Sequence, residues 1–324
     1  MKRFAAILFA VVFVVGMGTA VRAQPGNEAD KGALYQKFLD NFKKGPTEQA
    51  VANSAAKEYL DKYASLTDDA DKKVADYLRR WIGKYDVATR RFNLSQALVA
   101  QKGPEAFRLA KQVLIDSPDN VEVIYQMANL GTKMHYAGDT GFDVETLGYA
   151  KRAIDLLAAG KSLDPANPLD DKTRADSIAG LKFNYARMVM RSTPADAKPY
   201  LLDLVHGNTQ FKTDSFVYSL LGEAIGKLDY QPLAAKYRAE CDGKGATEAC
   251  DAQFKSMMPV IEKLLDAAAR AASYAETGSN AAIYSKYKAG WTNQAQDLYK
   301  ILHDDSTVGF AEYMAGVSAK PLPY

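Results

Sequence analysis

Apolar side chains recur at helical spacing along most of this chain. Between residues 255 and 274 the intervals between apolar residues are four, three, four and four, which place them on one helix face: Met257, Ile261, Leu264, Ala268 and Ala272. No sustained run alternates β-branched with polar residues, and no Asn-Gly or Asp-Gly turn joins two alternating runs. The sequence therefore predicts an all-α fold.

Some fifteen helices are expected, joined by short turns rich in Gly, Pro, Asp and Asn and arranged as successive hairpins. Pro259 is expected either to open its helix or to kink it. The expected ranges are 32–43, 47–64, 68–82, 87–101, 104–116, 119–137, 145–162, 171–191, 195–206, 212–228, 231–241, 255–274, 279–287, 291–303 and 306–317.

An internal repeat is suggested by the segment Tyr218–Ile225. It resembles the first helix of a tetratricopeptide repeat (TPR), with an aromatic residue followed by Leu221-Gly222, and Ala234 stands where the second helix has a small residue. Earlier units resemble the family at their ends, where Pro118 and Pro165 close apolar helices. The best matches lie within 100–241.

The resemblance implies helix hairpins stacked as a TPR-like α-solenoid over residues 31–324. Residues 242–324 would form a C-terminal helical cap. Such a hairpin cannot bury its apolar face alone, so neighbouring hairpins must stack. The alternative is an all-α protein whose repeat matches arise by chance.

The N-terminus has the pattern of a secretory signal peptide over residues 1–23. Lys2 and Arg3 precede the apolar run Phe4–Val15, and Val21-Arg22-Ala23 predicts cleavage after Ala23. Residues 24–30 would be a flexible lead-in. This pattern predicts a periplasmic or secreted protein with no membrane span after cleavage, whereas an uncleaved anchor helix is the alternative.

Charge argues against nucleic acid as the partner. Without the three basic residues of the leader, 38 basic residues stand against 39 acidic ones. Nucleic-acid-binding domains usually carry a clear basic excess.

The two cysteines, Cys241 and Cys250, flank a segment with two glycines that predicts a loop. In an oxidising compartment two nearby cysteines usually form a disulfide. Two free thiols, or metal or redox chemistry, are the alternatives, although the three histidines are far apart in the sequence and no Cys-x-x-Cys motif is present.

No sequence motif indicates catalysis. The chain has no Gly-x-Ser-x-Gly, phosphate-loop or His-Glu-x-x-His pattern, and its acidic clusters lie where helix capping explains them. We therefore expect no catalytic, cofactor-binding or metal-binding residues. The leading hypothesis is a non-enzymatic extracytoplasmic scaffold that binds a peptide or protein partner through a TPR-like groove. The alternative is a glycan-binding protein or an all-α polysaccharide hydrolase, for which the 19 tyrosines are the only support.

Three basic residues fall at one repeat position. The ninth residues after the helix anchors Ile124, Ile178 and Tyr218 are Lys133, Arg187 and Lys227. These three cations would form a ladder for an acidic ligand. Two aromatic residues on the same helices could supply apolar walls. The candidate partner-binding residues are Tyr125, Lys133, Phe183, Arg187 and Lys227. The alternative is that these cations lie on ordinary solvated helix faces.

Overall fold

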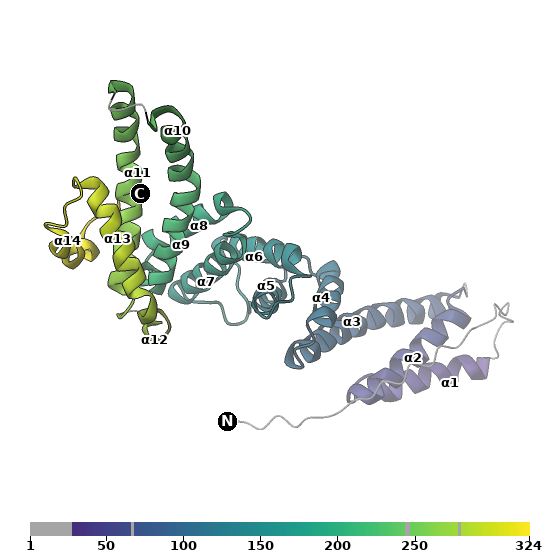
Figure 1. The fold of residues 1–324 in the computed structure, drawn as a ribbon. Helices are drawn as coiled ribbons and strands as arrows, with labels where there is room; N and C mark the ends of the chain where they lie inside the picture. The colour runs from purple at the N-terminus through teal and green to yellow at the C-terminus, as the bar shows by residue number, and fades with distance from the viewer. Residues whose placement is uncertain (1–27, 66–67, 244–246, 278–279) are drawn as a thin grey trace. The chain divides into compact units, whose positions relative to one another are not determined.

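A computed structural model describes residues 28–65, 68–243, 247–277 and 280–324 (Figure 1). These ranges contain helices and no strand, which confirms the all-α prediction. No helix within them has the length and apolar character needed to cross a bilayer. The expected leader, 1–23, and residues 24–27 of the lead-in lie outside the described residues. Contacts divide the chain into two compact units, Met1–Phe92 and Asn93–Tyr324. The sequence predicts a single domain over 31–324.

The first unit is built around a buried aromatic side chain. It comprises α1 (Glu28–Asn41), α2 (Pro46–Tyr63) and most of α3 (Asp69–Val99). Phe38 of α1 is fully buried, and its ring meets that of Trp81 on α3 edge to face at 5.0 Å. Tyr59 of α2 and Leu78 of α3 complete the core. Burial of such large side chains holds the three helices together.

Two helices of the first unit are longer than expected. Helix α1 includes residues 28–30, which are the first described residues, so these are helical rather than part of a lead-in. Helix α3 replaces the expected pair 68–82 and 87–101. Gly83 lies between them and costs about 1 kcal/mol of helix propensity, which does not end a helix of this length.

The second unit contains the remaining helices. From α4 to α9, each helix packs against the next one along the chain, as expected of successive hairpins. The helices are α4 (Gly103–Asp116), α5 (Val121–Tyr136), α6 (Asp143–Ala158), α7 (Asp171–Val189), α8 (Pro194–His206), η1 (Gln210–Thr213), α9 (Ser215–Ile225), η2 (Gly226–Tyr230), α10 (Gln231–Cys241), α11 (Glu248–Tyr274), α12 (Ala281–Tyr284), η3 (Ser285–Tyr287), α13 (Lys288–Leu302), α14 (Phe310–Gly316) and η4 (Val317–Ala319).

The best repeat match does not form a helix hairpin. Helices α9 and α10 are joined by the π-helical segment η2 without a turn, so the chain is helical from Ser215 to Cys241 (Figure 1). Pro232 explains the π segment, because a proline ring clashes with the carbonyl four residues earlier in an α-helix. In η2 the N–H of Gln231 instead bonds to the carbonyl of Gly226, five residues back, and helicity continues.

Helix α11 begins seven residues before the expected start at 255. The side chain of Thr247 accepts a hydrogen bond from the backbone N–H of Cys250 at 3.2 Å and caps the helix. Pro259 therefore lies inside α11 and does not open it. The helix then continues to Tyr274 and packs on both α9 and α13.

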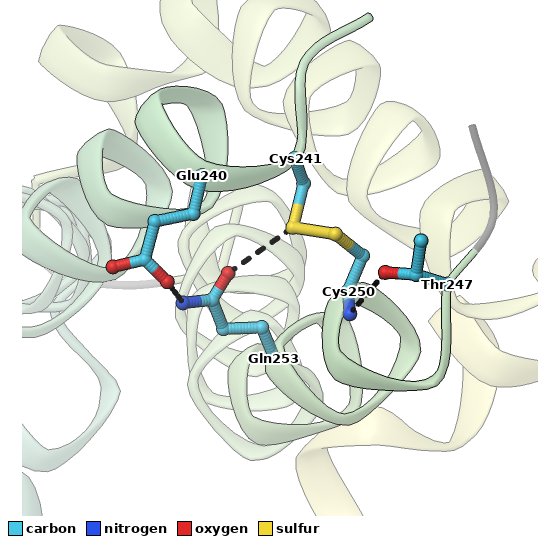
Figure 2. Close-up of a disulfide and its surroundings, with 5 residues drawn as sticks. All are labelled: Glu240, Cys241, Thr247, Cys250 and Gln253. Atoms are coloured by element: carbon cyan, nitrogen blue, oxygen red, sulfur yellow. Dashed lines mark hydrogen bonds between the residues drawn. A yellow bond between two sulfur atoms is a disulfide. The ribbon is translucent and has the colours of Figure 1, made fainter. Parts of the chain in front are cut away.

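A disulfide joins Cys241, the last residue of α10, to Cys250 in the first turn of α11 (Figure 2). Both cysteines are buried. Beside the bridge, the side-chain amide of Gln253 donates a 2.6 Å hydrogen bond to Glu240, which links the same two helices a second time. The expected pairing is thus present, and its role is to fasten α10 to α11.

We predict that removing this bridge destabilises the second unit without changing its helicity. Replacing both Cys241 and Cys250 by Ser should lower the free energy of unfolding by about 2.7 kcal/mol, because a ten-residue loop is no longer closed in the unfolded chain. Urea unfolding measures this difference. Two titratable thiols in the purified, non-reduced wild-type protein would contradict the prediction.

We also predict opposite effects for two glycines near the α5–α6 contact. A methyl group on Gly131 of α5 would overlap the hydroxyl group of Thr146 on α6, which is fully buried. Gly131→Ala should therefore destabilise the protein by about 2 kcal/mol. Gly148 of α6 has open space around it, so Gly148→Ala should stabilise by up to about 1 kcal/mol. Urea midpoints that shift in the same direction would contradict this packing.

Candidate functional site

Arg187, near the end of α7, is surrounded by aromatic rings. Its guanidinium carbon lies 4.3 Å from the centre of the Tyr136 ring, 5.2 Å from that of Phe183 and 5.3 Å from that of Phe216. The three rings come from α5, α7 and α9. A planar guanidinium is attracted to the electron-rich face of such rings, so the side chain is held in one place.

Local sequence explains how these rings are positioned. Phe183 precedes Arg187 by one helical turn on α7, and Tyr136 is the last residue of α5. Phe216 lies in the first turn of α9, where the side chain of Asp214 accepts hydrogen bonds from the backbone N–H groups of Phe216 and Val217. This cap fixes the start of α9 and thereby the ring of Phe216.

The guanidinium of Arg187 has no counter-ion among the residues that the structure describes. It forms neither a hydrogen bond nor an ion pair with any residue in the described ranges, and the side chain is only half-buried. Burial raises the pKa of Tyr136 and of Tyr284, and the positive charge of Arg187 opposes both rises. A fixed cation with free N–H donors beside apolar rings is suited to an oxyanion such as a carboxylate.

A groove lies between α9–η2 and α13. Its volume is about 730 Å³, and Leu264 of α11 also lines it. Glycines on both sides leave space in the groove, and both apolar and polar side chains line it. The lining residues are Gly222, Glu223, Gly226, Lys227, Tyr230, Gln231, Gly290, Asn293, Gln294, Asp297, Leu298 and Ile301.

The groove and the ring cluster lie along the same helix. Phe216, Ser219 and Glu223 follow one another at intervals of three and four residues, which places them on one side of α9, and the ammonium of Lys227 in η2 contacts Glu223. Phe216 stacks on Tyr284 of α12 at 5.4 Å. Further along, Ser219 accepts a 3.2 Å hydrogen bond from the indole N–H of Trp291 on α13, while the groove begins at Gly222.

The structure brings together only two of the five candidate residues. Arg187 and Phe183 are in contact. Tyr125 packs against the core, and Lys133 is exposed on α5 without a partner among the described residues. Lys227 lines the groove, where its ammonium is 2.7 Å from Glu223. The three cations therefore have three different environments.

The expected ladder fails as a set of equivalent positions for a physical reason. The angle around the helix axis between an anchor and the ninth residue after it is the same in every helix only if all the helices have the same number of residues per turn. Lys227 lies in η2, where π-helical bonding changes that number. The roles of Tyr136 and Phe216 were not anticipated, because both rings reach Arg187 from helices distant in sequence.

A second hollow, of about 650 Å³, lies between α11, α13 and α14. Carboxylates of Glu262 and Glu312 line it together with the ring of Tyr313. Asp266 also lines it, but Arg270 donates a 2.8 Å hydrogen bond to this carboxylate, and both side chains are buried. Asp266 is therefore committed to a structural ion pair.

Residues 320–324 complete this ion pair. The guanidinium of Arg270 donates to the carbonyl of Lys320 at 2.7 Å, and the hydroxyl of Tyr324 donates to Asp266 at 2.6 Å. Burial, and then the negative charge of Asp266, raise the pKa of Tyr324. Burial also raises the pKa of Tyr313, to about 12.

Within the described ranges, no group of three or more His, Cys, Asp or Glu side chains is arranged to hold a metal ion. Comparison of the chain with protein-family models, with curated proteins and with solved structures gives no match. The function must therefore be inferred from the geometry of these surfaces.

We predict a loss of stability above pH 10 that depends on Tyr324. Its folded-state pKa is higher than the unfolded value, so its contribution is complete below pH 10 and decreases as the unfolded chain ionises at higher pH. Tyr324→Phe should lower the free energy of unfolding at pH 7 by about 1–2 kcal/mol and make the alkaline decrease shallower. Urea unfolding between pH 7 and pH 11 measures both effects; an unchanged alkaline slope would contradict this role.

Proposed function

We propose that this protein is a non-enzymatic interaction protein that binds an acidic segment of a peptide or protein partner along α9–η2. The observation that carries the proposal is Arg187, a half-buried cation fixed by three rings and left without a counter-ion by the described residues. A carboxylate of the partner is the group that this cation lacks.

The energetics favour Arg187 as an anchor. A hydrogen bond to a charged group contributes about 1.5–3 kcal/mol, and a guanidinium can make two parallel bonds to one carboxylate. Because the rings already hold the guanidinium, less side-chain freedom is lost on binding. The same rings provide apolar contact for the carbon atoms next to the carboxylate.

The groove would accommodate the residues that follow the anchor. Phe216 and Lys227 are eleven residues apart, or about 16 Å along the helix. About five residues of an extended peptide span that distance. Apolar side chains of the peptide would lie over Leu264, Leu298 and Ile301, while the polar rim would bond its backbone.

We further propose an extracytoplasmic location and a TPR-like arrangement of the helices in the second unit. The disulfide supports the location, because such bridges persist in oxidising compartments. The packing of each helix from α4 to α9 on the next one supports the repeat arrangement. The continuous α9–η2–α10 segment departs from it.

The second hollow supports a second candidate function, saccharide binding or hydrolysis. Glu262 and Glu312 are carboxylates that sugar hydroxyls can bond, and Tyr313 provides a ring beside them. Glycosidases use a pair of carboxylates, and Asp266 is not available for that role. Binding to a glycan array in the absence of any peptide binding would favour this candidate.

Selection from a random peptide library tests the proposed function. We predict that the wild-type protein enriches peptides in which Asp or Glu is followed by apolar residues. Arg187→Gln should remove the acidic preference and weaken a selected peptide at least about tenfold, which corresponds to about 1.4 kcal/mol. Fluorescence polarisation of the labelled peptide measures the affinity.

Arg191→Gln is the matched control, because Arg191 is exposed in the turn that follows α7 and contacts none of the three rings. It should retain both the selection and the affinity. Equal acidic enrichment by Arg187→Gln and the wild type would refute the assignment of Arg187.

A further inference from the structure

Helix α3 carries an unusual concentration of positive charge. Between Lys72 and Arg91 the sequence contains seven basic and two acidic residues. Both acidic side chains are engaged: Asp76 with Arg79 at 3.0 Å, and Asp86 with Lys57 of α2 at 3.4 Å. The segment therefore carries more positive charges than its own two carboxylates can neutralise.

Three of these cations are exposed and unpaired. Lys73, Arg80 and Lys84 form no hydrogen bond or ion pair with any residue that the structure describes. They are seven and four residues apart, so each lies within about 20° of a common line along the helix. The line from Lys73 to Lys84 is about 16 Å long.

This line of cations, hereafter the basic stripe (Lys73, Arg80 and Lys84), faces away from the core of the first unit. The core side of the helix is marked by Ala75 and Leu78, which are 3% and 0% exposed. Those two residues lie about 140–160° around the helix from the stripe. The stripe is thus on the solvent side of α3.

We propose that the basic stripe binds the anionic surface of a lipid bilayer. A straight row of cations on one side of a helix can reach a flat surface at every position at once. Each lysine or arginine near such a surface adds to the attraction. Residues 28–92 as a whole carry 13 basic and 11 acidic residues, which is less basic than nucleic-acid-binding domains usually are. Binding to a bilayer, in contrast, requires an excess of positive charge on only one side of the unit.

Vesicle co-sedimentation tests this proposal, with the chain lacking residues 1–23 so that the apolar leader cannot insert into the bilayer. The probes are vesicles of phosphatidylcholine with and without phosphatidylglycerol. The wild type should bind only the anionic vesicles, and added salt should release it. Replacing Lys73, Arg80 and Lys84 together by Gln should weaken binding about a hundredfold, or about 1 kcal/mol for each cation removed.

The matched control replaces Lys236, Arg238 and Lys255 by Gln, because these exposed cations of the second unit give the same change in net charge. Circular dichroism and melting temperature should be unchanged in both triple variants. The control should bind anionic vesicles as the wild type does. Equal binding by the stripe variant, absence of wild-type binding to anionic vesicles, or wild-type binding to duplex DNA in place of vesicles would each overturn the proposal.

Discussion

The second unit depends on how closely other helices can approach α11. From Ala267 to Ala272 every residue of this helix is alanine except Arg270, and all of them are buried. Small side chains allow neighbouring helix axes to come close. At Gly222 of α9 an added methyl group would lie 3.4 Å from the methyl group of Ala267, so the two helices are already in contact. This contact and the packing of α13 on α11 position the two walls of the groove.

The one charged residue in that alanine run explains the position of residues 320–324. A buried ion pair is tolerated only when its remaining hydrogen-bonding groups are also satisfied. Asp266 accepts a hydrogen bond from one N–H of Arg270 and another from the hydroxyl of Tyr324, while the carbonyls of Lys320 and Pro321 accept from the guanidinium in the described structure. The last residues of the described chain thus pack against α11 because two buried charges require them.

The two proposed binding surfaces use positive charge in different ways. Arg187 is a single cation held by rings, so it can select the geometry of one carboxylate. The basic stripe of α3 consists of separate exposed cations, whose attraction is additive and depends on salt rather than on geometry. The first surface is suited to a specific segment, whereas the second is suited to an extended anionic surface.

The sequence by itself determined the helical class, most helix positions and the pairing of Cys241 with Cys250, because helical periodicity and the short loop between the cysteines are local properties. It also placed the candidates Arg187 and Phe183 one turn apart on one helix, where their side chains are in contact. Only the tertiary structure decided that Tyr136 and Phe216 enclose Arg187, and that the chain passes through η2 without a turn. Contacts between distant helices depend on how side chains pack in three dimensions, and a periodic pattern within each helix does not contain that information.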